Sequence, residues 1–578
     1  GVATSFVNAT TPRHQYGAFG GRTVENDATG NRTSDGRSTY AWDARGIDGI
    51  RCDFGQGLPP QCWEYIINTA RSKKWNFVAM SESLDGGAVT YRANRHFDIL
   101  NENIVFPLAS ASTNTDYRNL FEQRRNAYGQ GLVLINNTSH DEANYTDPWE
   151  ALIRYSVACS LDGVPMIFPG QELGISATYG YNHYELNFGK YVPHFKRFNS
   201  MKPIWDDTDF GNDQLYPVYA GLGAARAFSP ALRSSNRWFL DGDGYNNKIH
   251  AVAKYETANA LPAFSDVVLA FANLDRNNDK QDNFKLPSAL ATLLGIQDAR
   301  SYNVRNIAAY LGADNTRRNQ WLWNGSAGYS GSQLKTTGFL VVLPKVPTMN
   351  SSGNPSDPAW NQRPFEAQYL KLYDVTPPPA PPVPAGPNLY AYVAGDSVTF
   401  TWSPAADPQG GVAGFRVQVG TTAGGSDLLD TTTTATSRTL AGLAYGSVVY
   451  ARVCQLNNAG IEGAYSSSSA AIEVLDPAAD RDADGVANGY EDVAGTDPFD
   501  RDSLLKLDSI TLGGGSATIT VPTVPGRYYQ LEGCGDLSSW TVLEANFLAD
   551  DTTHGFVDPE AGSAQRRFYR VRVSRGPL

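Results

Sequence analysis

The sequence predicts an α/β fold, with a parallel sheet built from βα units, followed by all-β domains. From about residue 46, short apolar runs alternate with amphipathic helical patterns, which is typical of consecutive βα units. From about residue 235 the pattern changes to short strands separated by turn signals such as DGDGYNN. Five segments of the first region are candidate strands: GIDGIRCDF, WNFVAM, FDILNENIVF, GLVLIN and VPMIF.

Two segments between these candidate strands are expected to be crossover helices. In PQCWEYIINTARSKK, Trp63 and Ile67 fall on one helical face, and in DPWEALIRYSVACSL the same spacing joins Trp149 and Val157. This spacing favours core packing for Trp149. A further helix is expected near YPVYAGLGAARAFSPALRSS, just before the first all-β region.

The length of 578 residues exceeds what one hydrophobic core supports, so several domains are expected. The Pro-rich string TPPPAPPVPAGP indicates a semi-rigid linker, and the alternating strands after it indicate a sandwich. The predicted divisions are a loop-rich remnant at 1–45, an α/β region at 46–234, an all-β domain at 235–375, the linker at 376–387, a sandwich at 388–475, a calcium-binding Asp-rich spacer at 476–505 and a terminal β module at 506–578. Through TFTWSP and VYARVCQLNNAG, the sandwich at 388–475 resembles a fibronectin type III domain.

The charge, hydropathy and cysteine content of the sequence exclude several classes of partner and structure. With 47 basic and 59 acidic residues the net charge is -12, which argues against nucleic acid and anionic membranes as partners. No run of eighteen apolar residues occurs, so no membrane span is predicted. Five cysteines in so long a chain cannot form a disulfide framework, and only Cys52 and Cys62 are candidates to pair.

Acidic residues follow three of the candidate strands. Arg51 and Asp53 are two residues apart and therefore face the same side of an extended strand, where the guanidinium can keep the carboxylate ionised. Glu82 follows FVAM, and Asp141 follows a later strand beside His140. Because glycosidic bond cleavage uses one carboxylate as nucleophile and one carboxylic acid as proton donor, these positions are candidates for that chemistry.

The segments GIRCDF, SES, SHDE and GVPMIFPGQELG resemble the ordered signature segments of the α-amylase family, glycoside hydrolase family thirteen. The resemblance covers roughly residues 46–375 and implies a partial TIM (β/α)8 barrel, about strands 4 to 8. It also implies roles for single residues. Asp53 would be the nucleophile, Glu82 the general acid and base, and Asp141 the transition-state stabiliser, and the substrate would be bound by Arg51 and His140.

The sequence departs from the family pattern in two places. Where many amylases carry a Lys-His pair after the nucleophile, this chain has Gln56 and Gly57. No counterpart of the family's first signature segment precedes Asp53, and residues 1–45 contain no strand pattern. We therefore expect an N-terminally truncated piece of a longer enzyme, with impaired catalysis in the chain as it stands.

The segment DRDADGVANGYE at 480–491 matches an EF-hand-type calcium loop position by position, with Gly485 at the sharp turn. The predicted Ca2+ ligands are Asp480, Asp482, Asp484, the Val486 carbonyl, Asn488 directly or through water, and bidentate Glu491. The alternative is a solvated acidic linker. Weak loops of this kind need millimolar calcium, which favours a secreted, periplasmic or cell-surface protein.

The sequence thus predicts a retaining α-glycoside hydrolase acting on an α-1,4-glucan or related oligosaccharide, as a monomer. Two alternatives remain open. A transglycosylase or sucrose-type enzyme uses the same three carboxylates and differs in the acceptor that resolves the intermediate. A non-catalytic glucan-binding protein would bind starch without turnover.

Overall fold

The structure is a computed structural model. It describes residues 48–82, 97–101, 108, 110–124, 128, 131–136, 148–167, 171–173, 215–309, 319–345, 367–387 and 390–578. The predictions for residues 1–45 lie outside these ranges. The chain divides into two compact units, Gly1–Val375 and Thr376–Leu578.

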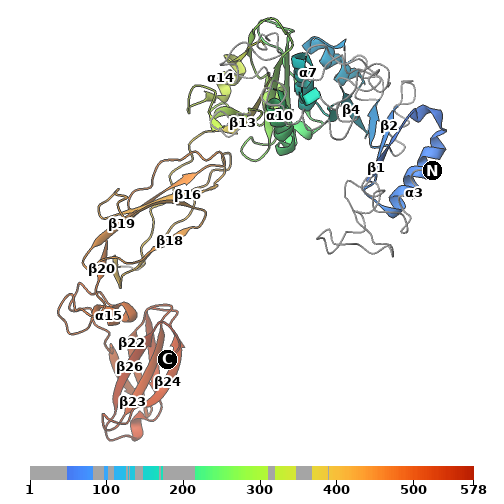
Figure 1. The fold of residues 1–578 in the computed structure, drawn as a ribbon. Coiled ribbons are helices and arrows are strands. Elements are labelled where there is room, and N and C mark those ends of the chain that lie inside the picture. Colours follow the sequence, from blue (N-terminus) through green and yellow to red (C-terminus); the bar gives the residue numbers. More distant parts are fainter. Residues whose placement is uncertain are drawn as a thin grey trace, which may run out of the picture. The chain divides into compact units, whose positions relative to one another are not determined.

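The first unit contains the predicted parallel sheet (Figure 1). Its strands are β1 (Gly49–Cys52), β2 (Val78–Glu82), β3 (Ile99–Asn101), β4 (Leu132–Asn136) and β5 (Val164–Met166). They pair in the order β1-β2-β3-β4-β5, and every pair is parallel. Four strands lie within predicted segments, and β2 overlaps WNFVAM but continues to Glu82. Within the described residues the sheet is open and closes no barrel.

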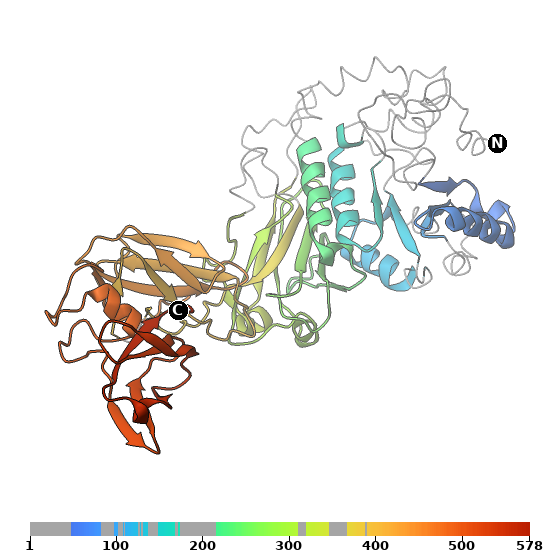
Figure 2. The ribbon, with the colours of Figure 1, turned by 90° about the horizontal axis from the view of Figure 1, so that it is seen from below.

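Helices connect and cover this sheet. They are η2 (Gly55–Gly57), α3 (Pro60–Lys73), α6 (Asn114–Asn119), η3 (Leu120–Arg124), α7 (Pro148–Ser160), η5 (Gln171–Leu173), α10 (Tyr216–Phe228) and α11 (Pro230–Arg233). The predicted crossover helices are confirmed as α3 and α7, and α7 and α10 pack side by side (Figure 2). Trp149 is fully buried, so the prediction that its helical spacing places it in the core is confirmed.

An antiparallel sheet packs against these helices. Its strands, in the order β11-β10-β13-β8-β7-β6, are β6 (Arg237–Phe239), β7 (Ile249–Tyr255), β8 (Val267–Asn273), β10 (Ser301–Asn306), β11 (Tyr329–Ser330) and β13 (Ala367–Asp374). Both faces of β7 and β8 are buried. Val252 and Val268 belong to the core shared with α7 and α10, whereas Ala251 and Leu269 belong to a second core on the opposite face.

The second core is closed by a smaller sheet and two short helices. These elements are β9 (Lys280–Phe284), which pairs with β12 (Phe339–Leu343), and the helices α12 (Ser288–Leu293) and α14 (Gly331–Thr336). Phe284 and Phe339 pack with Phe271 of β8 in one aromatic cluster. The sheet therefore separates two hydrophobic cores and ties the α/β part to the all-β part of the unit.

The second unit contains two sandwiches joined by one helix. The first sandwich has the sheets β14-β20-β19-β16-β17 and β15-β18, with β14 (Tyr392–Ala394), β15 (Val398–Thr401), β16 (Gly414–Gly420), β17 (Leu429–Thr433), β18 (Ser437–Leu440), β19 (Val448–Leu456) and β20 (Ile472–Leu475). Helix α15 (Asn488–Ala494) follows it. The terminal sandwich has the sheets β21-β22-β25 and β24-β23-β26, with β21 (Ser509–Gly513), β22 (Ser516–Pro522), β23 (Tyr528–Cys534), β24 (Thr541–Leu548), β25 (Thr553–Asp558), η11 (Ala561–Ser563) and β26 (Phe568–Ser574).

The Pro-rich segment 376–387 packs on the first sandwich. Pro378, Pro381 and Pro384 are buried, a spacing of three that matches the three residues per turn of a polyproline II helix. Ala385 and Thr401 exchange two backbone hydrogen bonds of 2.8 and 3.1 Å. This part of the predicted linker thus contributes side chains and backbone bonds to the sandwich.

The one disulfide that the sequence allowed does not form, because Cys52 and Cys62 are both free thiols. The strand β1 turns Cys52 into the core, where burial raises the pKa of its thiol to about 11, whereas α3 places Cys62 at the surface. None of the helices in the described part of the chain is long and apolar enough to cross a membrane.

A histidine is buried where β7 packs on α7. His250 is 1% exposed, its Nε2 lies 2.9 Å from the Ser160 hydroxyl oxygen, and its Nδ1 has no hydrogen-bond partner. The rings of Tyr117 and Phe239 meet the imidazole edge to face. Burial lowers the pKa of His250 to about 3, because the charged form cannot be solvated there.

This histidine predicts a loss of stability in mild acid. The unfolded chain takes up the His250 proton near pH 6.5 and the folded chain only near pH 3, so the stabilisation is complete above pH 6.5 and is lost as the pH falls. The free energy of unfolding should fall by about 1.4 kcal/mol per pH unit from this group. Urea denaturation of wild type and His250→Gln between pH 4.5 and 7 checks this, and equal pH slopes in the two proteins would contradict it.

Candidate functional site

The predicted carboxylates of β1 and β2 meet at one edge of the parallel sheet. The two strands pair in register, with Arg51 opposite Met80 and Cys52 opposite Ser81, so their carboxyl ends lie together. Arg51 of β1 forms ion pairs with the carboxylate of Asp53 and, at 2.5 Å from Nη2 to Oε1, with Glu82. One guanidinium thus holds both carboxylates at the edge where parallel α/β sheets carry their sites.

The turn after β1 supplies a further contact that the sequence did not indicate. The backbone N–H of Phe54 donates to Oε2 of Glu82 at 3.3 Å. Phe54 has φ 49° and ψ 54°, a left-handed conformation that is uncommon for a residue with a side chain. The indole Nε1 of Trp63 donates to the Gly55 carbonyl at 2.7 Å and anchors the turn on α3.

The two carboxyl groups have different surroundings. The side chain of Glu82 is 12% exposed and that of Asp53 is 77% exposed. Burial raises the pKa of Glu82, the Phe54 N–H and the charge of Arg51 oppose that rise, and a hydrogen bond with Asp53 and its charge add to it. Two carboxyl groups with such different environments suit one proton donor and one ionised partner.

Two further predicted residues of this site, and two residues of the segment GVPMIFPGQELG, are placed as follows. Asp141 and His140 lie outside the described residues. Gln171 is buried, and its Nε2 donates to the Tyr219 hydroxyl at 3.1 Å. Glu172 lines a pocket of about 500 Å³ between α7 and α10 together with Tyr155 and Tyr219. Gln171 therefore packs between the helices beside the sheet, whereas the half-buried Glu172 faces the pocket.

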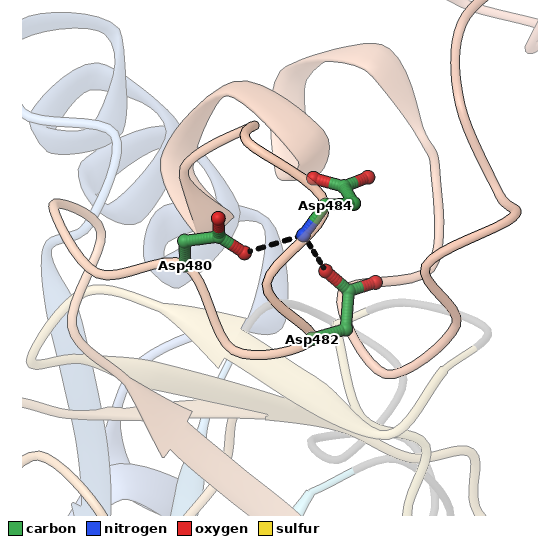
Figure 3. Close-up of side chains that lie close together, drawn as sticks. All are labelled: Asp480, Asp482 and Asp484. Atoms are coloured by element: carbon green, nitrogen blue, oxygen red, sulfur yellow. Dashed lines mark hydrogen bonds between the residues drawn. The ribbon is translucent and has the colours of Figure 1, made fainter.

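The predicted calcium loop forms a cluster of three carboxylates (Figure 3). We call Asp480, Asp482 and Asp484 the acidic loop, and one oxygen of each lies within 4.8 Å of the others. The backbone N–H of Asp484 donates to Asp480 at 3.2 Å and to Asp482 at 3.1 Å, which folds the loop around its own acidic side chains. Gly485 adopts a φ of +98° at the turn.

A fourth carboxylate faces the acidic loop from α15. Glu491 is fully buried, and its Oε2 has no hydrogen-bond partner. Burial raises the pKa of Glu491 to about 7, and the charges of Asp482 and Asp484 add to this rise. One oxygen of each of these two aspartates, Oδ2, is also buried without a partner. Such a set of buried oxygens fits a hard divalent cation, which takes oxygen ligands.

Asn488 has a different role from the one that the sequence suggested. Its side chain was expected to reach the metal, directly or through water. In the structure its Oδ1 accepts a hydrogen bond from the Arg481 N–H at 3.0 Å, and its Nδ2 donates to the Asp476 carbonyl at 2.8 Å. The amide therefore holds the start of the loop to α15.

No protein-family model and no curated protein matches the chain. Among solved structures, it is similar to a maltogenic α-amylase from Thermotoga neapolitana, with a TM-score of 0.33 and 12% identity over 56% of this chain and 59% of that one. An α-amylase from Lactobacillus plantarum gives a TM-score of 0.33 and 14% identity over 57% of this chain and 63% of that one.

A fibronectin type III-like protein from Clostridium thermocellum gives a TM-score of 0.13 and 26% identity over 17% of this chain and 93% of that one. The chain spans about six tenths of the length of the two amylases it resembles. The assignment of chemistry to this chain therefore depends on its own residues.

Proposed function

We propose that Asp53 and Glu82 are the catalytic pair of a retaining glycosidase. The observation that carries this proposal is the single guanidinium of Arg51, which binds both carboxylates at the ends of neighbouring parallel strands. Arg51 keeps Asp53 ionised for attack, while the burial of Glu82 favours its protonated form. The surroundings of the two residues thus suit Asp53 to be the nucleophile and Glu82 to be the acid.

The reaction then takes two displacements. Asp53 attacks the anomeric carbon while Glu82 gives its proton to the departing glycosidic oxygen, which forms a covalent glycosyl-enzyme. Glu82, now ionised, takes a proton from water as that water attacks the same carbon and releases Asp53. The ion pairs of both carboxylates with Arg51 support a short separation, because retaining enzymes keep their carboxyl groups about 5–5.5 Å apart, whereas inverting enzymes keep them about 6.5–9.5 Å apart to admit a water molecule.

The proposed substrate is an α-1,4-glucan or a related α-glucoside. This choice is supported by the segments that resemble the α-amylase family, in which Asp141 and His140 would bind the hydroxyl groups of the distorted sugar ring. The proposal extends to hydrolysis, with water as the acceptor. A sugar acceptor would make the same intermediate the start of a transglycosylation.

The Asp53→Asn variant should lose at least about a thousandfold in the release of reducing sugar from soluble starch and maltooligosaccharides, because the amide cannot form the covalent intermediate. The matched control is Asp48→Asn. Asp48 pairs with Lys74 just before β1, at the opposite end of the strand from Asp53, and its loss should leave activity unchanged. The assay is run on the full 578-residue chain.

The products decide between the rival functions. Reducing sugar that appears with retained anomeric configuration supports the hydrolase. Longer oligosaccharides without net release of reducing ends would replace it with the transglycosylase. Binding to starch with no turnover would overturn the proposal in favour of a glucan-binding protein.

A further inference from the structure

Helix α15 is tied to the first sandwich through the segment that follows β20. The backbone N–H groups of Asn488 and Gly489 donate to the carbonyls of Ala479 and Pro477 at 2.8 and 3.0 Å. The Asn488 side chain adds its bond to the Asp476 carbonyl, directly after the last strand of that sandwich. The first turn of α15 is therefore attached by three hydrogen bonds to the segment that directly follows β20, the last strand of the first sandwich.

The last turn of α15 is tied to the terminal sandwich by two arginines. Nε of Arg527 donates to the Val493 carbonyl at 3.1 Å, and its Nη2 donates to the Asp492 carbonyl at 3.4 Å. Arg575, which directly follows β26, pairs with the Asp492 carboxylate and also donates to its carbonyl. These guanidinium groups satisfy carbonyls that a helix end leaves open, where positive charge is favoured.

We propose that a calcium ion held between the acidic loop and Glu491 fixes α15 in place and thereby holds the two sandwiches of the second unit in one arrangement. Glu491 directly precedes Asp492, whose carbonyl and carboxylate contact the terminal sandwich. The ligand that closes the metal site and the residue that contacts the next module are therefore neighbours on one short helix.

Charge and burial explain why the ion is needed for this arrangement. The three carboxylates of the acidic loop lie together, and the charges of Asp482 and Asp484 act on Glu491. Oδ2 of Asp482, Oδ2 of Asp484 and Oε2 of Glu491 are buried and without a partner. Without a cation, the mutual repulsion of the carboxylates favours withdrawal of Glu491 from the acidic loop. This withdrawal weakens the position of α15. Calcium fits better than magnesium, because it accepts six to eight oxygen ligands in flexible geometry, whereas magnesium usually keeps several waters.

The test is amide hydrogen exchange of the full chain in calcium chloride and in a chelator, beside calorimetric titration with calcium chloride. At a hundredfold excess of calcium over its dissociation constant, local opening should slow by about a hundredfold by mass action. We expect this protection at 480–495 and also at 524–527 in the terminal sandwich. Strands of the first unit, such as β7, serve as the internal control and should not respond.

Two variants separate binding from coupling. Glu491→Gln removes a charged ligand and should weaken calcium binding at least tenfold and abolish both regions of protection. The double variant Arg527→Ala and Arg575→Ala leaves the ligands intact, so calcium should still bind and protect 480–491 while the protection at 524–527 is lost. Absence of calcium binding in the wild type would overturn the site. Binding that protects only 480–491 in the wild type would overturn the role of α15 as a joint.

Discussion

The Glu82→Gln variant is expected to hydrolyse starch about 10²–10⁴-fold more slowly than the wild type but to keep most of its first-step rate on an α-glucosyl fluoride. A sugar leaving group needs the proton that Glu82 supplies, whereas fluoride departs without one. The amide of glutamine keeps the volume of the side chain and can still accept from the Phe54 N–H, so the turn after β1 should be preserved.

Comparing starch with the α-glucosyl fluoride separates the loss of acid catalysis from other effects of the Glu82→Gln substitution. The measurements are fluoride release and reducing-sugar release under the same conditions, with Asp53→Asn as the contrasting variant. Asp53→Asn should fail on both substrates because it lacks the nucleophile. Added azide should accelerate the Glu82→Gln variant, since this anion attacks the glycosyl-enzyme without base catalysis. Equal losses on both substrates, with no effect of azide, would remove Glu82 from the role of acid.

The sequence predicted those parts of the fold that local patterns encode. All five strands of the parallel sheet overlap segments predicted from short apolar runs, although β2 continues two residues past its segment to Glu82. The helical spacing of Trp149 correctly indicated burial. The Arg51–Asp53 pair could also be predicted from the sequence, because residues two apart on a strand face the same side. That Arg51 also binds Glu82 depends on the register between β1 and β2, which no single segment specifies.

Contacts between segments that are far apart in the chain could not be predicted from the sequence. The His250 imidazole meets Ser160, and the Tyr369 hydroxyl donates to the Ser156 carbonyl, only because the antiparallel sheet packs on α7. The sequence also contained no indication of the left-handed backbone conformation of Phe54, since the residue favoured for that conformation is glycine. Asn488 was placed among the metal ligands by its position in the motif, yet its amide also fits two backbone groups of the loop.

The same limit applies to Arg226, which the sequence offered only as one more basic residue near a helix end. Its Nη1 donates to the carbonyls of Cys159, Leu161 and Leu232 at 2.7, 2.9 and 2.8 Å, and its Nη2 donates to that of Gly163 at 2.6 Å. One guanidinium thus satisfies the carbonyls at the end of α7 and in the following turn. Burial lowers the pKa of Arg226, which reflects the cost of keeping this charge inside the protein.

Replacing Arg226 with methionine should therefore destabilise the first unit by about 3–5 kcal/mol, since four carbonyls lose their donor at a buried position. The Arg226→Lys variant keeps the charge and some donors and should lose about half as much. The control Arg233→Met changes an exposed arginine of α11 and should stay within about 0.5 kcal/mol of the wild type.

Urea denaturation followed by tryptophan fluorescence gives these free energies. The order Met, Lys, wild type is the decisive feature, because a role limited to charge would make lysine equivalent to arginine, and a role limited to packing would make methionine harmless. The hydrogen-bond distances argue against both of these restricted roles. The planar guanidinium of Arg226 donates at the same time to carbonyls on α7, in the turn after α7 and on α11. A decrease in the free energy of unfolding below about 1 kcal/mol for Arg226→Met would mean that water molecules bind these carbonyls instead. The end of α7 would then not depend on the arginine that α10 supplies.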